Sequence, residues 1–251
     1  TIGPGGATIC TGESTTIDVD LTGTGPFTFI YRINGINQVP VNTPGPTYSI
    51  NVTPNNPGTF NYTLVSVTGN GCTGTVSGAY SLVVNQSPTA TLSGGATVCA
   101  GQGTPLSVSF TGTGPFTFDY TADGVPQGPV TTSNNPFVFI VAPSTTTTYE
   151  ITEVSAGGCM GTVQGIAVVT VNPSPSAVLT GGNVALCSGQ TDTLHFALSG
   201  PSPYTFVYAV NGVSQPPITT SQSTYNIVVS PAASSTYTLV SVSGGGCNGF
   251  I

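Results

Sequence analysis

The sequence repeats itself three times at a spacing close to 88 residues. The block LTGTGPFTFIY at 21–31 returns as FTGTGPFTFDY at 110–120 and as LSGPSPYTFVY at 198–208, at offsets of 89 and 88 residues. An Asn-Gly or Asp-Gly dipeptide begins three residues after each block. A fixed internal period means that one structural unit recurs along the chain, and 88 residues is the size of a small domain. The chain is therefore restricted to an array of three similar modules.

Within each repeat, the hydrophobic pattern has the period of a β-strand. Phe27, Phe29 and Tyr31 alternate with Thr28 and Ile30, which directs one aromatic row toward a core. The Asn-Gly and Asp-Gly pairs predict tight hairpin turns, because their residues adopt positive φ at little cost. About seven such strands for each repeat predict an all-β chain of three tandem immunoglobulin-like Greek-key β-sandwiches.

The module boundaries follow from the repeat. We predict modules at residues 1–86, 87–174 and 175–251. The junctions VVNQSPTATL at 83–92 and VTVNPSPSAVL at 169–179 are short and contain proline. Such segments are stiff, which favours modules that lie end to end as a rod.

The third module stops early. The first two modules end on the strand-like segments AYSLVVN (79–85) and IAVVTVN (166–172), and no counterpart follows Cys247. Two explanations stay open at this stage. The sequence is a window on a longer array, or a neighbouring chain donates the last strand.

The six cysteines divide into two for each repeat. Because three equivalent folds would share one pairing, we predict disulfides within the modules, each closing a loop of about 60 residues and contributing about 4 kcal/mol. These pairs are Cys10–Cys72, Cys99–Cys159 and Cys187–Cys247. No Cys-x-x-Cys pair indicates zinc. Disulfides place the chain in an oxidising compartment, and we expect it outside the cell or at the cell surface.

Charge excludes several function classes. Only 4% of residues are charged, and Arg32 is the one basic side chain other than His195, so nucleic-acid binding is excluded. No apolar run approaches the roughly 18 to 20 residues that span a bilayer, so we expect no membrane insertion of this segment. The carboxylates do not recur at equivalent module positions, and His195 has no partner in sequence. Asp18 and Asp20 suggest calcium only superficially, and a solvated strand face is the better interpretation. We predict no enzyme, no metal site and no cofactor apart from covalent glycans.

Modification sites are the remaining candidates. Ser and Thr make up about a quarter of the chain, well above ordinary usage, and offer many positions for O-linked sugars. Asn51 and Asn61 each open an Asn-x-Thr sequence, the acceptor pattern for N-glycosylation. In a chain this rich in Thr the pattern also arises by chance.

Four features together resemble a known group of repeats. The LTGTGPFTFxY block, the Asn-Gly turn, the YTLVSVTxxGC strand and the VVNxSP junction resemble the Ig-like or PKD-like tandem repeats of large secreted and cell-surface proteins of Bacteroidota. The WxFGDG signature of true PKD domains is absent. The resemblance implies stalks, adhesins or matrix fibres, and O-glycans at Asp-Thr followed by an apolar residue, which makes Thr193 a candidate.

We interpret the chain as a structural component of an extracellular bacterial fibre or surface stalk. Its partners would be further repeats or neighbouring chains of the same protein, and glycans. The alternative is an adhesin that binds carbohydrate or protein through its inter-strand loops at 38–46, 127–135 and 215–223. Those loops vary, but none carries the aromatic and charged cluster of a binding hot spot. A secreted hydrolase would need a catalytic domain outside this sequence.

Overall fold

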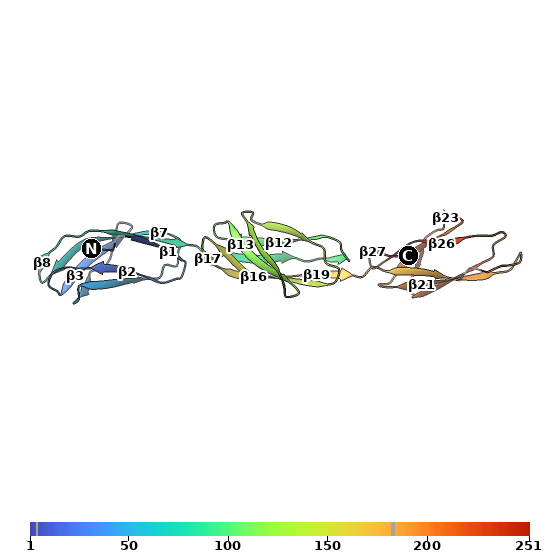
Figure 1. Cartoon of the computed structure of the whole chain (residues 1–251), viewed down its shortest axis with the longest axis horizontal. Coiled ribbons are helices and arrows are strands. Elements are labelled where there is room, and N and C mark those ends of the chain that lie inside the picture. The colour runs from blue at the N-terminus through green and yellow to red at the C-terminus, as the bar shows by residue number, and fades with distance from the viewer. Residues whose placement is uncertain (4, 182–183) are drawn as a thin grey trace.

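Three β-sandwiches lie end to end as a rod (Figure 1). The structure, a computed structural model, describes residues 1–3, 5–181 and 184–251. The described residues form strands and no helix. The expected all-β fold of three tandem immunoglobulin-like modules is confirmed. We call the sandwiches module 1 (β1 to β9), module 2 (β10 to β19) and module 3 (β20 to β27).

Module 1 consists of two packed sheets. The larger follows the order β1-β9-β7-β3-β4, with β5 beside β3 and β8 beside β7, and the smaller pairs β2 with β6. The strands are β1 (Gly5–Cys10), β2 (Thr15–Asp20), β3 (Phe27–Ile33), β4 (Ile36–Asn37), β5 (Val41–Thr43), β6 (Thr47–Val52), β7 (Gly58–Gly69), β8 (Cys72–Thr73) and β9 (Ala79–Asn85).

Module 2 repeats this plan. One sheet has the order β15-β12-β10-β18, and the other has the order β11-β19-β16-β13-β14, with β17 beside β16. The strands are β10 (Thr89–Gly94), β11 (Thr97–Cys99), β12 (Thr104–Thr111), β13 (Phe116–Ala122), β14 (Val125–Thr132), β15 (Phe137–Val141), β16 (Thr147–Ala156), β17 (Cys159–Met160), β18 (Thr162–Gln164) and β19 (Ile166–Asn172).

Module 3 has the same two layers with fewer strands. Its sheets follow the orders β20-β21-β25 and β23-β22-β26-β27, with β24 beside β22. The strands are β20 (Ser176–Thr180), β21 (Asp192–Ser199), β22 (Tyr204–Val210), β23 (Val213–Ser214), β24 (Ile218–Thr220), β25 (Thr224–Val229), β26 (Tyr237–Gly244) and β27 (Cys247–Asn248). None of the strands in this described part corresponds to β9 or β19.

The aromatic rows form the cores. Phe29, Phe118 and Phe206 stand at equivalent positions of the repeated block and are at most 1% exposed. Each belongs to a separate hydrophobic cluster, one in each sandwich. The period of two therefore places the aromatic side chains between the sheets, as expected.

The predicted hairpin turns are confirmed. Asn34, Asp123 and Asn211 have φ of 48°, 49° and 51°, and the glycine after each also has positive φ. Each of these side chains also accepts a hydrogen bond of 2.8 Å at its Oδ1 atom from a backbone amide in or just before the neighbouring strand β7, β16 or β26. The donors are the amides of Asn61, Thr148 and Thr236. The turn residue thus supplies the backbone conformation and fastens the turn to the sheet.

Strand direction determines which residues reach the ends of a module. β1 runs parallel to β9, so Cys10 lies opposite Asn85 at the end that faces module 2. β7 runs antiparallel to β9, with Gly58 opposite Val84, and carries the chain to the other end. The hairpin after β7 brings Cys72 opposite Gly69 at that far end.

Candidate functional site: the module junctions

Disulfide bonds connect successive modules. Cys10 of module 1 is bonded to Cys159 of module 2, and Cys99 of module 2 is bonded to Cys247 of module 3. The Cα atoms are 5.6 Å apart in both bridges, and the bonded residues are separated by 149 and 148 positions in sequence. In each bridge, the cysteine of the earlier module is the last residue of a strand, β1 or β11. The cysteine of the later module directly follows a Gly-Gly turn.

The predicted pairing within modules is wrong. Cys10 lies at the level of Asn85, and Cys72 lies beyond the opposite end of β7, which is 12 residues long. At about 3.3 Å per residue this strand holds the two cysteines roughly 35 Å apart. A disulfide needs Cα atoms within about 7 Å. The same antiparallel geometry excludes Cys99–Cys159. Cys187–Cys247 is excluded because Cys247 is bonded to Cys99 and Cys187 forms no disulfide within the described residues.

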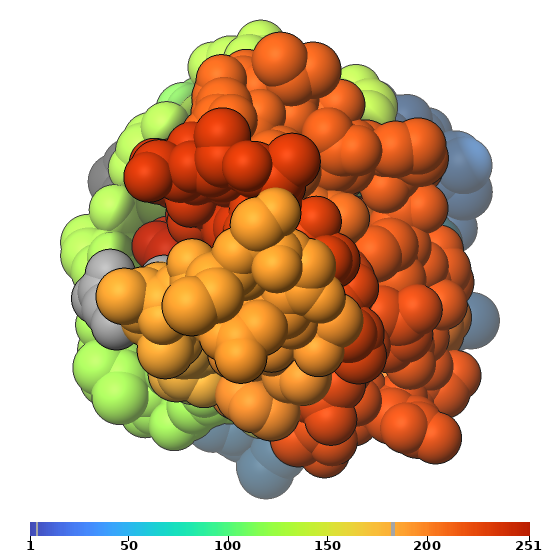
Figure 2. Space-filling view, turned by 90° about the vertical axis from the view of Figure 1, so that its right-hand side faces the viewer, coloured from blue at the N-terminus to red at the C-terminus, as the bar shows by residue number. Residues whose placement is uncertain are grey.

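Two cysteines stand at the ends of the rod. Cys72 and Cys187, both within the described residues, are exposed and form no disulfide. Cys72 opens β8 at the outer end of module 1 (Figure 1). Cys187 precedes β21 in module 3. Figure 2 views the rod from its module 3 end, where the light-orange segment that leads into β21 projects toward the viewer. By repeat position, Cys72 is equivalent to Cys159, and Cys187 is equivalent to Cys99.

Polar contacts reinforce each junction. The Asn85 Nδ2 atom donates to the Gly157 carbonyl at 2.7 Å, and Asn172 Nδ2 donates to the Gly245 carbonyl at 3.0 Å. Both asparagines are the last residue of a strand, and both glycines lie in the hairpin that carries the bridging cysteine. The same three links therefore join the modules at both junctions: the polypeptide linker, a disulfide and a side-chain hydrogen bond.

The hairpins at the junctions require glycine. Gly157 and Gly245 have φ of +57° and +60°, and the next residue is also a glycine with positive φ. A Cβ atom on Gly245 would lie 2.7 Å from the Cγ atom of Pro201, and one on Gly157 would lie 3.4 Å from Asn85 Nδ2. The glycines thus supply the turn, and in module 3 they leave room for Pro201 of the same module; across the junction a Cβ atom on Gly157 or Gly245 would meet only ordinary contacts of 3.4 Å and 3.9 Å with Asn85 and Asn172.

The candidate glycosylation residues lie on strands. Asn51 on β6 and Asn61 on β7 are exposed. The backbone amide of Asn61 donates to the Asn34 side chain at 2.8 Å, and among the described residues no hydrogen bond of the Asn61 side chain competes with its exposure to solvent. Thr193 on β21 is half-buried, and its amide donates to the Asp192 carboxylate at 2.8 Å. The three positions are spread over two modules and form no common site.

The ionisable groups are dispersed. Asp18 and Asp20 are exposed on β2, where Asp18 accepts a hydrogen bond of 2.6 Å from the Ser49 hydroxyl. His195 is exposed on β21, with its Nδ1 atom 2.9 Å from the Asn226 side chain. In the described ranges, no three His, Cys, Asp or Glu side chains gather as metal ligands. The search of the same residues also finds no helix with the length and apolarity to cross a bilayer.

Three tyrosines have perturbed pKa values. Burial raises the pKa of Tyr62 above 10.0, and its neighbour Tyr31 adds to the shift. Burial also raises the pKa of Tyr31 and of Tyr149. Desolvation disfavours the phenolate in each case. These are core residues, so the shifts report packing and not a reactive site.

Comparison with known proteins shows the fold. No protein-family profile matches the sequence, and no curated protein matches it. Among solved structures, the chain is similar to the "I-band fragment I67-I69 from titin", with a TM-score of 0.61 and 14% identity over 99% of this chain and 94% of that chain. An E-to-A variant of the same three titin domains gives a TM-score of 0.60 and 15% identity, over 99% of this chain and 95% of that chain. Identity at this level establishes three tandem immunoglobulin-like domains and nothing finer.

Proposed function

We propose that the chain is a structural segment of an extracellular fibre or surface stalk, in which disulfides lock each module to the next. The observation that carries this proposal is the placement of both bridges between modules. A bridge inside a sandwich stabilises that sandwich, whereas a bridge across a junction also restricts bending of the array. The chemistry is mechanical, and we assign no catalytic role to any residue.

The surface and the compartment support the same role. The net charge of −7 is spread over 251 residues, and the exposed strand faces carry mostly hydroxyl and amide groups. Such a surface gives little charge repulsion against lateral association. Disulfides persist outside the cytosol, which favours an extracellular or cell-surface location of the kind that the resemblance to Bacteroidota repeats implies. Sugars on Asn51, Asn61 or Thr193 would lie on the outside of the rod.

The bonding pattern can extend beyond the three modules. Cys72 lacks a partner from a preceding module, and Cys187 lacks one from a following module, although the equivalent cysteines at both internal junctions are bonded. We propose that each forms the same bridge to a further repeat in the fibre. Each bond would form by thiol–disulfide exchange with an oxidised dithiol partner, which accepts the two electrons as the two thiols lose their protons.

Alkylation of native material tests this proposal. Cells and secreted material are alkylated before and after reduction, and peptides that contain Cys72 and Cys187 are analysed by mass spectrometry. We expect both cysteines to be blocked until reduction, together with immunogold labelling along filaments or stalks. Free thiols at both positions, or labelling confined to the cell interior, would refute the fibre proposal.

A further inference from the structure

One sheet edge in module 2 is open and apolar. β15 forms the edge of the sheet β15-β12-β10-β18, and among the described residues β12 is its one partner. All five residues of β15, Phe-Val-Phe-Ile-Val, are apolar. Val138 and Ile140 point outward and are 54% and 67% exposed. Proteins usually protect a sheet edge with a charge, a proline or a bulge, because an open apolar edge strand pairs with other strands.

The equivalent edge of module 1 carries polar side chains. Ser49 and Asn51 on β6 take the places of Val138 and Ile140, and both are exposed. The Ser49 hydroxyl also donates to the Asp18 carboxylate on the neighbouring strand β2 at 2.6 Å. This edge therefore has the polar and charged groups that discourage pairing with another strand.

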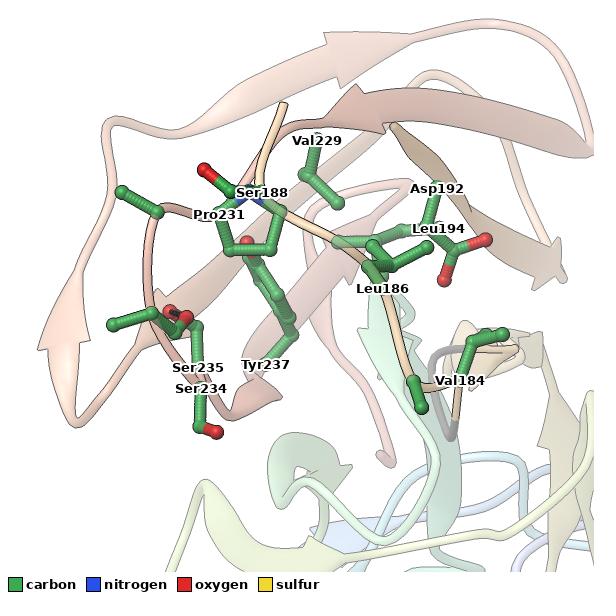
Figure 3. Close-up of a pocket in the computed structure, with 13 residues that line it drawn as sticks. Val184, Leu186, Ser188, Asp192, Leu194, Val229, Pro231, Ser234, Ser235 and Tyr237 are labelled. Carbon is green, nitrogen blue, oxygen red and sulfur yellow. Dashed lines mark hydrogen bonds between the residues drawn. The ribbon is translucent and has the colours of Figure 1, made fainter. Parts of the chain in front are cut away.

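The equivalent edge of module 3 is also next to ionisable groups. Asn226 on β25 takes the place of Val138 and lies 2.9 Å from the His195 ring. Asp192 lies opposite Val229 of the same edge strand, and both residues line a hollow of about 380 Å³ (Figure 3). Module 2 has no ionisable residue at these places.

The whole sheet that contains β15 is without charge. The strands β10, β12, β15 and β18 contain no Asp, Glu, Lys, Arg or His. The four charged residues of module 2 lie on the other sheet or in its turn: Asp119, Asp123, Glu150 and Glu153. A second copy that approached this edge with its own β15 would therefore meet no like charge on the sheet.

The backbone groups of the outward residues face the open edge. Ile140 lies opposite Pro105 of β12, which has no amide hydrogen, and the Pro105 carbonyl faces β10, 3.1 Å from a Cβ atom built on Gly94. Antiparallel pairs alternate between those that exchange two hydrogen bonds and those that exchange none. Ile140 and Val138 thus belong to pairs without hydrogen bonds to β12, and their amides and carbonyls point away from it. In the described part of the chain, no backbone group outside the ladder bonds to them.

Both ends of the open strand are defined. The Asn135 side chain fastens its start, because the Oδ1 atom accepts from the Phe110 amide at 3.0 Å and the Nδ2 atom donates to the Phe110 carbonyl at 2.8 Å. Pro136 and Pro143 flank the strand, and a proline cannot donate to a further ladder. Pairing is confined to this short strand, which is roughly 16 Å long.

The strand is complementary to itself. A twofold axis at Phe139 places Val138 of one copy opposite Ile140 of the other, and both such pairs exchange two backbone hydrogen bonds. On the inner face, Phe139 meets Phe139 of the second copy, and Phe137 meets Val141. The Phe137 and Phe139 rings, with centroids 5.9 Å apart, are half-buried at the open edge. Apolar side chains therefore oppose each other on both faces, and the pairing removes them from water.

We propose that β15 is a self-pairing edge, through which two copies of this chain associate as antiparallel β15 strands about a twofold axis. The contact is isologous, so it closes with two copies and does not propagate. It joins two rods side by side at their second modules, and a contact of this size is typical of weak association. The inference deepens the proposed function by naming a lateral contact, and it rests on that function only for the occurrence of the contact between rods in a fibre.

Sedimentation equilibrium tests the pairing on the purified 251-residue protein. Cys72 and Cys187 are first alkylated, so that disulfide-linked dimers do not form. We expect a reversible dimer with a Kd between about 10 µM and 1 mM. Ile140→Lys places a charge on the edge and should raise the Kd at least about tenfold. The matched control Asn51→Lys, at the equivalent position of module 1, should change the Kd less than about twofold. A chain that stays monomeric at about 1 mM, or a dimer that both variants weaken equally, would overturn the proposal.

Amide exchange read by NMR locates the contact without a substitution. In the monomer the amides of Val138 and Ile140 face solvent, whereas the Phe139 amide bonds to β12. When about nine-tenths of the chain is dimeric, exchange at Val138 and Ile140 should slow roughly tenfold, because only the remaining monomer exchanges. A dimer that leaves these two amides unprotected would contradict pairing through β15. Both measurements are independent of the alkylation and labelling of native fibres, so either proposal can fail without the other.

Discussion

The pairing of the cysteines predicts which single substitution destabilises module 1. With module 2 folded and Cys10 bonded to Cys159, an unfolded module 1 is a closed loop of roughly 75 residues between Cys10 and the linker. Closing a loop of this size lowers the entropy of the unfolded state by an amount equivalent to about 4 kcal/mol at 25 °C. A bridge between modules thus stabilises module 1 about as much as an internal bridge would.

We therefore expect Cys159→Ser to lower the unfolding free energy of module 1 by about 4 kcal/mol, which corresponds to a fall in its Tm of roughly 15 to 30 °C. The matched control is Cys72→Ser, which removes an exposed thiol and should change stability by less than about 0.5 kcal/mol. Hydrogen exchange in urea, read by mass spectrometry on peptides of module 1, measures both variants. If Cys72→Ser destabilised module 1 and Cys159→Ser did not, the pairing between modules would be refuted.

Three further predictions concern packing and pH. Gly165→Ala should destabilise module 2 by about 2 to 4 kcal/mol, because Gly165 has φ of +89° and a Cβ atom would lie 2.1 Å from the Leu92 carbonyl. Chemical denaturation measures this loss. The control is Gly45→Ala, whose Cβ atom would have no neighbour closer than 3.9 Å. Asn85→Ala should leave the stability of the modules nearly unchanged but broaden the distribution of angles between modules 1 and 2, as measured by X-ray scattering; an unchanged distribution would show that the disulfide and linker alone fix the junction. Because burial raises the folded-state pKa of Tyr62, the unfolded state loses this phenol proton first. The contribution of Tyr62 to the unfolding free energy should therefore be fully present below about pH 10 and be lost as pH rises beyond it; a titration of absorbance at 295 nm that showed ordinary pKa values for all tyrosines would contradict this.

Much of the fold follows from local sequence. Alternation predicts the inward aromatic row, and Asn34-Gly35 predicts its turn, because both depend only on residues that are neighbours along the strand. The early end of module 3 is also readable from the repeat. The incomplete burial of Leu186 and Tyr237 could not be predicted from local sequence, because it depends on which strand covers the equivalent residues in the other modules.

The junction was beyond local reasoning. The repeat shows that each module carries two equivalent cysteines, but pairing within a module and pairing with the next module have the same repeat symmetry. The deciding fact is that β7 carries the chain away from Cys10, a consequence of strand order and length. The strand-ending residues Asn85 and Asn172 were a usable signal, because each precedes a proline-containing linker and no core position requires an amide there.

The two bridges enclose overlapping stretches of the polypeptide, from 10 to 159 and from 99 to 247. Every peptide bond between Cys10 and Cys247 consequently lies inside at least one covalent ring. A protease that hydrolyses any one of these bonds leaves both fragments attached through a disulfide. In an array that continues the pattern, the load would pass around the cut, and the rod would lose its continuity only after reduction or after several cleavages in the same rings.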